Sequence, residues 1–311
     1  MLSVVIPVYN NAENLARLFT ALESLAPGFP GGFEVVFVVD GSPDNSLAIL
    51  RAYLARRTFP AKLIELSRNF GAFPAIAAGL RHGRGDYFAV LAADLQEPPD
   101  LIVEFARVMK ENEADIVIGA RRRRADPWLS RMLSSLFWKF YRRFVIPDLP
   151  AGGVDIFGCT KAVRDQLVEM KEVNTSLVGL LFWLGFRRTV VQYDRRPREG
   201  GRSGWTVQKK WRYALDSIFS FSDLPIRVLL VIGGTATVLA VVASTTVLVF
   251  WTLGLIPVLG YTPLMLAVAT FGGLTSLGLG IVGQYLWLAL QNGRNRPAFV
   301  VRSTEDFDEL P

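Results

Sequence analysis

VLAADLQEPPD, residues 90–100, begins as an apolar strand and ends in three acids, an amide and a pair of prolines. Asp94 and Gln96 therefore directly follow the open end of a strand, and the prolines stiffen the backbone behind them. Pro99 is typical of the first turn of a helix, which we expect to reach Glu111. Taken alone, this acidic loop is either a solvated turn or a site that needs oxygen ligands, and the neighbouring segments decide between the two.

Short apolar runs and helical stretches alternate through the first 120 residues. The expected strands are residues 4–9, 33–39, 62–66, 87–92 and 116–120. Between them, Asn11 is expected to cap a helix that runs to about Leu25, and Asp44 to cap one over residues 45–55. This order predicts an α/β fold with a doubly wound, mostly parallel sheet and right-handed crossovers.

Polar residues follow four of these strands at the point where each one ends. Asp40 follows the second strand, Arg68 the third, Asp94 the fourth, and the arginine run 121–124 the fifth. In doubly wound sheets, ligands bind at the carboxyl ends of the strands. Each residue alone is also ordinary turn chemistry. Together they indicate a nucleotide-type site at one edge of the sheet.

The carboxyl-terminal third of the chain predicts a membrane domain. The chain of 311 residues is 51% apolar, and no Asp, Glu, Lys or Arg occurs between Arg227 and Arg294. A spanning helix needs about 20 apolar residues. We expect two transmembrane helices at about residues 226–253 and 263–290, because prolines and a glycine interrupt the apolar run between them. A buried helical hairpin is disfavoured, since the rest of the chain is too small to enclose it.

The flanks of these segments predict their orientation. Arg227 and Arg294 lie at the outer ends of the two segments and the connection 254–262 is uncharged, which places both termini and the soluble domain in the cytosol. A single cysteine, Cys159, fits a reducing compartment. Small residues recur every four positions at Gly272, Ser276 and Gly280, which suggests homo-oligomer formation through the transmembrane helices.

The net charge of +6 fits anionic lipid head groups or phosphate substrates. No RNA-binding motif or zinc-finger spacing is present, so we expect no nucleic acid partner.

Two stretches, 128–145 and 206–221, combine an apolar stripe with basic residues, which is typical of amphipathic helices at a membrane interface. For the first of them, a core helix against the sheet remains an alternative. The predicted divisions are an α/β core at 1–125, a region with the two amphipathic stretches at 126–225, the membrane domain at 226–290 and a cytosolic tail at 291–311.

Five segments together carry a family resemblance. They are VVIPVYNNAENL, VVDGSPDNS, LSRNFGAFPAIAAGL, RGDYFAVLAADLQEPPDLI and IVIGARRRR. In order and spacing, residues 2–225 resemble the catalytic domain of inverting family 2 glycosyltransferases with a GT-A fold. The polyprenyl-phosphate glycosyltransferases are most similar, among them dolichyl-phosphate mannose synthases and bacterial enzymes that glucosylate undecaprenyl phosphate. The resemblance implies a UDP-, GDP- or dTDP-linked sugar donor, a polyprenyl phosphate acceptor and, with two carboxyl-terminal spans, the bacterial inner membrane.

The same resemblance implies roles for residues on the donor side. Asp94 and Gln96 would hold a divalent cation, Mg²⁺ or Mn²⁺, both of which take oxygen ligands. The donor-binding residues implied are Pro7, Tyr9, Asp40, Arg68 and Asp94. Two positions depart from the family pattern, because Ala92 and Val39 stand where many members have Asp. These departures weaken the expectation of a tightly held metal.

On the acceptor side, the resemblance makes Asp155, within GGVDIFGC, the catalytic acid, although it could instead cap the following helix. A phosphate monoester is largely dianionic at neutral pH, so a proton-abstracting role for Asp155 is expected from the family only. Arginine binds phosphate oxygens in a bidentate way. The expected phosphate-binding residues are Arg122, Arg124, Arg202 and Ser203. A glycine-rich hinge without a ligand is the alternative for the last two, because Gly204 stands where the family has lysine.

The sequence thus predicts an inverting glycosyltransferase that moves a sugar from a nucleotide sugar to a polyprenyl phosphate at the cytosolic membrane face. A catalytically silent membrane scaffold is the alternative that Ala92, Val39 and Gly204 suggest. Processive polymer synthesis is disfavoured, because two spans in each chain do not form a channel unless chains associate.

Overall fold

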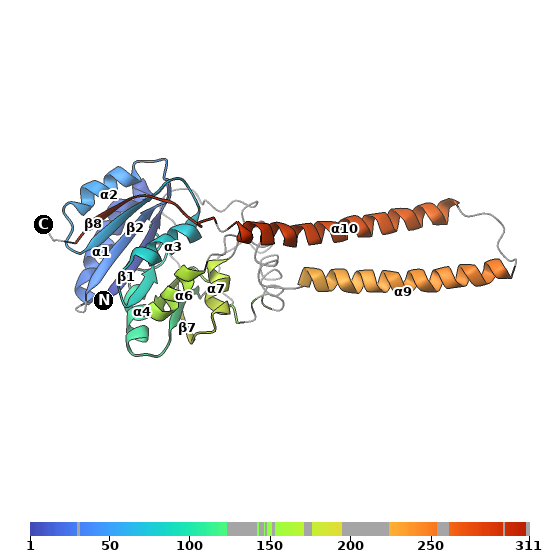
Figure 1. Cartoon of the computed structure of the whole chain (residues 1–311). Helices are drawn as coiled ribbons and strands as arrows, with labels where there is room; N and C mark the ends of the chain where they lie inside the picture. Colours follow the sequence, from blue (N-terminus) through green and yellow to red (C-terminus); the bar gives the residue numbers. More distant parts are fainter. Residues whose placement is uncertain are drawn as a thin grey trace.

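The computed structural model describes residues 1–29, 32–122, 142, 146, 148–150, 153–170, 176–194, 224–253, 261–294 and 296–308. An eight-stranded sheet with helices on both faces forms one end of the molecule, and two long helices project from it (Figure 1). The expected α/β fold with a mostly parallel sheet is therefore confirmed, and its strand order is β7-β5-β6-β4-β1-β2-β3-β8.

Five strands lie close to their expected positions and three were not expected. The strands are β1 Leu2–Val8, β2 Phe33–Val39, β3 Ala61–Leu66, β4 Tyr87–Val90, β5 Ile116–Arg121, β6 Ile156–Thr160, β7 Arg188–Tyr193 and β8 Val301–Phe307. Strands β6 and β8 run antiparallel to their neighbours, and the other six are parallel to one another. The carboxyl ends of those six strands consequently share one edge of the sheet.

The helices of the soluble part confirm the alternating pattern. They are η1 Ala12–Asn14, α1 Leu15–Leu25, η2 Ala26–Gly28, α2 Ser46–Leu54, α3 Ala72–His82, α4 Leu101–Lys110, α6 Lys161–Glu169 and α7 Leu177–Trp183. Asp44 accepts a hydrogen bond from the backbone N–H of Ser46, but the N-cap position of α2 is Asn45, so the predicted cap lies one residue too early. The predicted cap at Asn11 is wrong, because its side-chain oxygen accepts from Asn14 Nδ2 and a 3₁₀ turn precedes the helix.

Each face of the sheet packs against its own layer of helices. One apolar cluster joins the sheet to α1, α2 and α4, and the other joins it to α3, α6 and α7. This explains the nearly continuous apolar sequences of β1 and β2, since a parallel sheet covered on both faces buries both sets of side chains. Helix α3 lies especially close, because a Cβ added to Gly79 would be 2.2 Å from Val5 Cγ1.

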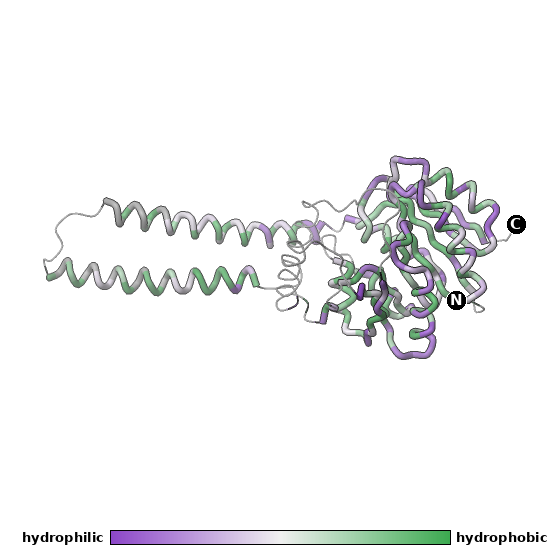
Figure 2. Tube along the Cα trace, turned by 180° about the vertical axis from the view of Figure 1, so that it is seen from behind, coloured by the Kyte–Doolittle hydropathy of each residue, from purple (hydrophilic) through white to green (hydrophobic). Residues whose placement is uncertain are grey.

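The projecting pair consists of α9, Leu224–Thr252, and α10, Tyr261–Gly293. They run alongside each other, and Figure 2 shows their hydrophobic character. Within the described residues, one segment, Thr270–Gly293, is long and apolar enough to cross a membrane, and Leu224–Ala236 is a shorter apolar stretch. The structure thus supplies one candidate span, and the second expected span remains a prediction.

Several expected features fall outside the described residues. These are the amphipathic helices expected at 128–145, apart from Arg142, and at 206–221, together with Arg124, Arg202 and Ser203. At the carboxyl terminus the structure adds an element that the sequence did not predict. Within the expected tail 291–311, strand β8 pairs antiparallel with β3 and becomes an edge of the sheet.

The only cysteine of the chain, Cys159 on β6, gives a direct test of this core. Burial raises the pKa of its thiol to about 12, so it is not ionised at pH 8, and the thiolate is the nucleophile in alkylation. We expect iodoacetamide at pH 8 to leave the folded protein unmodified and to modify it fully in guanidinium chloride, as measured by intact mass. Alkylation of the folded protein at the rate of a free thiol would contradict the placement of β6.

Candidate functional site

The site lies at the sheet edge where the six parallel strands end. The order of the strands reverses between β1 and β4, since β1 has β2 on one side and β4 on the other. A ligand crevice is expected at such a switch point. This edge faces the end of the molecule from which α9 and α10 project (Figure 1). The residues Tyr9, Asp40, Arg68, Asp94 and Arg122 all follow strands that end here.

Asp40, at the end of β2, holds the loop that follows β3. Its two carboxylate oxygens accept the backbone N–H groups of Phe70 at 2.7 Å and Gly71 at 2.8 Å. Only 2% of Asp40 is exposed, and this burial raises the pKa of its carboxyl despite the two hydrogen bonds. Next to it, Gly41 has φ +56° and a Cβ there would be 2.4 Å from the backbone of Arg68. Asp40 therefore fixes the shape of the loop that follows β3 at this edge of the sheet.

A second hydrogen-bonded loop joins the ends of β1 and β2. Ser42 Oγ accepts from the backbone N–H of Asn10 at 2.7 Å, and Asp44 accepts from that of Ala12 at 2.9 Å. Burial favours the neutral form of Asp44, but hydrogen bonds from Ser42, Ser46 and Ala12 outweigh it and hold its pKa below the usual value. Pro7 lies within β1, and Tyr9 just beyond it is 47% exposed. Pro7 and Tyr9, which were expected to bind the sugar donor, thus lie next to this hydrogen-bonded loop.

The loop after β4 carries Asp94 and Gln96. Asp94 Oδ1 accepts the backbone N–H of Gln96 at 3.3 Å, and Leu95 between them has φ +52°. That left-handed conformation costs a non-glycine residue roughly 1–2 kcal/mol. Leu95 is buried in the apolar core while Asp94 and Gln96 remain partly exposed. Packing of Leu95 thus offsets the strain of a turn that leaves both polar side chains accessible.

The residues of this loop fit a divalent cation only in part. A carboxylate and a carboxamide are suitable ligands for Mg²⁺ or Mn²⁺. In the part of the chain that the structure describes, no group of three or more acidic, histidine or cysteine side chains lies together as a ready metal site. Oxygen ligands from a bound diphosphate and from water would have to complete the coordination.

Asp155 lies at the start of β6 and joins the ends of two neighbouring strands. Arg121, the last residue of β5, donates to both of its carboxylate oxygens, with Nε 2.6 Å from Oδ2. Tyr193, the last residue of β7, donates its hydroxyl to Oδ2 at 2.6 Å. Pairing with Asp155 raises the pKa of Arg121, and burial, followed by the Asp155 hydrogen bond, raises that of Tyr193. Three strand ends therefore meet in one charged cluster.

Glu97 connects this cluster to the Asp94 loop. It is 2% exposed, and Tyr193 Oη lies 3.5 Å from its Oε1. Glu97 directly follows Gln96 in the chain. A displacement of Tyr193 or Asp155 would therefore also displace the loop that carries Asp94 and Gln96. The sequence did not identify Tyr193, because β7 was not predicted.

Of the expected phosphate-binding residues, Arg122 is the one that the structure describes. Arg121, and not Arg122, is directed at Asp155; Arg122 is exposed and its Nη1 lies 3.4 Å from Asp194. Arg68 is also exposed and stacks over the Phe70 ring at 4.1 Å. The capping role considered for Asp155 is not seen, since the next helix, α6, begins only at Lys161, after β6.

Comparison with known proteins identifies the family. Residues 3–169 match the sequence model of Glycosyl transferase family 2. The chain belongs to this family. An uncharacterized glycosyltransferase from Synechocystis sp. is 34% identical over 313 residues, with coverage of 100% of this chain and 97% of the relative. The SfII prophage-derived bactoprenol glucosyl transferase of Shigella flexneri is 29% identical over 97% of this chain and 98% of its own.

Solved structures include a similar protein as well. Mannosyl-3-phosphoglycerate synthase from Rubrobacter xylanophilus aligns with a TM-score of 0.48 at 18% identity, over 70% of this chain and 71% of that one. The sequence matches show that the chain is a glycosyltransferase, which confirms the predicted enzyme class.

Replacing Asp40 with Asn tests whether this side chain holds the loop that follows β3. An amide oxygen keeps one of the two backbone hydrogen bonds, and its NH₂ group faces the other donor, so we expect a loss of about 1–3 kcal/mol in unfolding free energy. The measurement is thermal unfolding in detergent. Asp100→Asn, on an exposed residue before α4, is the matched control and should change little. Equal melting of both variants would show that Asp40 does not hold the loop.

Replacing Arg121 with Lys tests the charged cluster. Lysine keeps the charge but not the paired donors, so Asp155 loses its fixed orientation. We expect sugar transfer to fall by roughly 10², the scale on which misplacement of catalytic groups acts. Arg122→Lys is the control, because its exposed pair with Asp194 contributes little. The reverse ranking of the two variants in steady-state kinetics would assign the phosphate-binding role to Arg122.

Proposed function

We propose that this glycosyltransferase transfers a sugar, with inversion, from a nucleotide sugar to a polyprenyl phosphate at the cytosolic face of the bacterial inner membrane. The observation that carries the proposal is the position of the site: the sheet edge that holds Asp94, Arg121 and Asp155 faces the end with the apolar helices. A relative covering nearly the whole chain is named a bactoprenol glucosyl transferase. A lipid-borne acceptor fits this arrangement.

The donor half of the site lies around the ends of β1, β2 and β4 in this proposal. Tyr9 and the loop held by Asp40 border the pocket for the nucleoside, and Pro7 and Arg68 flank it. Asp94 and Gln96 lie where the diphosphate would be bound. The proposed donor is a UDP-, GDP- or dTDP-linked sugar. In the expected GT-A fold, the diphosphate binds where the strand order reverses between β1 and β4.

Asp94 and Gln96 would hold a divalent cation, Mg²⁺ or Mn²⁺, together with diphosphate oxygens. Such a cation supplies stabilisation of the negative charge that develops on the departing diphosphate. Leu95 contributes indirectly, because its buried side chain fixes the turn that orients both ligand residues. The loss of a second acid at Ala92 implies that the donor diphosphate contributes more to cation affinity than the protein does.

The acceptor half lies around Arg121, Asp155 and Tyr193. A phosphate monoester has a second pKa near 6, so an acceptor phosphate is already a nucleophile at neutral pH and needs no base. Asp155 has its carboxylate engaged by Arg121 and Tyr193, which suits a residue that orients others. In this proposal Asp155 positions the Arg121 guanidinium, which binds a phosphate oxygen, and Arg122 and Arg124 add positive charge. Arg202 and Ser203 are proposed as further phosphate contacts.

The membrane part of the proposal has two spans, α9 and α10, with both termini and the soluble domain in the cytosol. The positive flanks and the uncharged connection between the helices support this orientation. The small residues Gly272, Ser276 and Gly280 on α10 support association between chains in the membrane.

The test is transfer of radiolabelled sugar from UDP-, GDP- and dTDP-linked donors into lipid that can be extracted with organic solvent. Asp94→Ala should lower transfer by roughly 10²-fold or more, the scale of removing one charge-stabilising group, and raise the Mn²⁺ concentration for half-maximal rate. Asp100→Ala is the matched control. Abundant transfer by Asp94→Ala with unchanged metal dependence would contradict the assignment of Asp94. Absence of turnover by the wild type with every donor would favour the scaffold alternative.

A further inference from the structure

Strand β8 reconnects the membrane helices to the soluble domain. Helix α10 ends at Gly293 and β8 begins at Val301, so seven residues, 294–300, separate them. Seven residues span at most about 25 Å when fully extended. While β8 stays in the sheet, the adjacent sheet edge can therefore lie no farther than this from the end of α10.

The pairing of β8 begins beside the donor half of the site. Strand β8 runs antiparallel to β3 from Val301, opposite Leu66, to Phe307, opposite Ala61. One residue earlier, the backbone carbonyl of Val300 accepts the N–H of Ser67 at 2.9 Å. Ser67 directly precedes Arg68 and the loop that Asp40 holds. The chain that leaves α10 thus meets the sheet next to the loop that Asp40 holds, in the proposed donor half of the site.

Side-chain ion pairs and hydrogen bonds attach β8 to the rest of the domain. Acidic residues of the strand pair with basic residues of the domain: Glu305 with Arg51 at 2.6 Å and Asp306 with Lys62 at 2.9 Å. Within the sheet, Glu65 of β3 receives Arg302 Nη1 and Ser303 Oγ, each at 3.1 Å. Each exposed pair is worth about 0–1 kcal/mol, so the strand is held by several weak contacts together.

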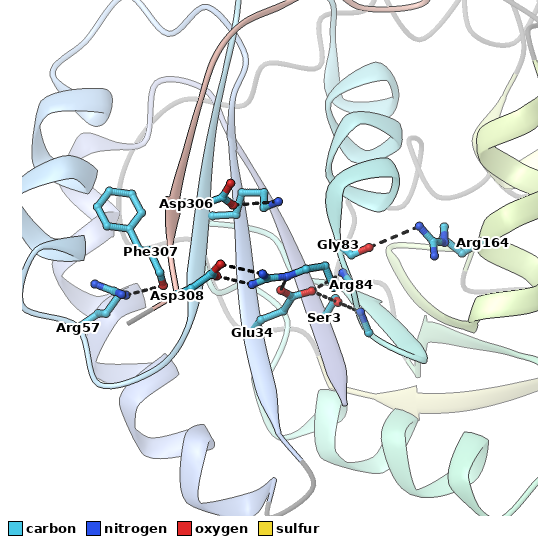
Figure 3. A network of polar contacts seen from close by, with 11 residues as sticks. Ser3, Glu34, Arg57, Gly83, Arg84, Arg164, Asp306, Phe307 and Asp308 are labelled. Carbon is cyan, nitrogen blue, oxygen red and sulfur yellow. Dashed lines mark hydrogen bonds and ion pairs between the residues drawn. The ribbon is translucent and has the colours of Figure 1, made fainter. Parts of the chain in front are cut away.

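Apolar contacts and a buried acid complete the attachment. Phe307 packs against one core cluster, and Phe299 and Val301 pack against the other. Beyond the strand, Asp308 pairs with Arg84, which also pairs with Glu34 (Figure 3). Glu34 is 1% exposed and accepts from Ser3 Oγ as well. Asp308 is therefore connected through Arg84 to Glu34, near the amino end of the central strand β2. This end of the strand lies opposite the site.

We propose that β8 is a membrane tether that holds the catalytic sheet at a fixed distance and orientation from α10. This inference rests on the proposed function, because only an acceptor confined to the membrane makes that distance matter. The phosphate of a lipid acceptor stays near the bilayer surface, so a donor pocket that drifts away no longer meets it. Reactions depend steeply on such positioning, since a misplacement of 1 Å can cost about 10²-fold in rate.

A variant in which β8 can be reversibly cross-linked to β3 tests the tether. Lys62 and Asp306 are directly opposite each other, and opposite residues of an antiparallel pair lie about 4.5–5.5 Å apart at Cα, within the range of a disulfide. The variant Lys62→Cys/Asp306→Cys/Glu305→Arg loses both ion pairs when reduced and is locked by a disulfide when oxidised. The native Cys159 is buried and does not compete. Thr304→Lys, at an exposed position of the same strand, is the control for added charge.

Transfer from UDP-, GDP- or dTDP-linked sugar is measured with two acceptors: a long-chain polyprenyl phosphate in phosphatidylglycerol-containing liposomes, and a ten-carbon isoprenyl phosphate in detergent. The reduced variant should lose roughly tenfold or more of the transfer to the liposome acceptor, with little change toward the detergent-soluble one. Oxidation should restore the lost activity, and Thr304→Lys should match the wild type. UDP binding, measured by calorimetry, should stay the same throughout. A chain that ends at Val300 should behave like the reduced variant.

Equal losses with both acceptors in the reduced variant and in the chain that ends at Val300 would overturn the proposal, because β8 would then support only the fold or the donor pocket. Unchanged transfer to the liposome acceptor by the chain that ends at Val300 would overturn it as well. Failure of the proposed function gives a different result, namely no transfer to either acceptor by the wild type.

Discussion

The paired contact between Arg121 and Asp155 is the interaction on which the proposed acceptor half of the site depends. It joins the end of β5 to the start of β6, and Tyr193 adds the end of β7. Contact between Tyr193 and Glu97 extends the cluster to the loop of Asp94 and Gln96. A carboxylate engaged in this way is suited to orienting a guanidinium group for phosphate, and an ionised phosphate acceptor requires no more of it.

The proposed donor half depends on a different kind of constraint, in which acidic side chains hold backbone N–H groups. Asp40 fixes the loop after β3, and Asp44 fixes the turns after β1 and β2. Both halves meet at the β1/β4 switch, and β8 connects this arrangement to α10. Since the site edge faces the apolar helices, a soluble donor bound there would, in the proposed function, lie close to a membrane surface.

The sequence predicted the parts of the fold that have a strong local signal. Strands β1 to β5 are apolar runs bounded by turn residues, and Asp94 and Gln96 lie at the sheet edge as expected. Strand β8 was missed because it is polar and charged, and its stability comes from partners more than 200 residues away, such as Arg51 and Lys62. Within the arginine run, the pattern could not show that Arg121 turns toward Asp155, since that choice depends on the pairing of β5 with β6.

The most direct test of the account is a crystal structure of the full chain with UDP and Mn²⁺, using anomalous scattering to locate the metal. The account predicts an anomalous peak in coordination contact with the Asp94 carboxylate, with the diphosphate between that loop and the Arg121–Asp155 pair. A diphosphate bound away from Asp94, or a metal held by other residues, would contradict it.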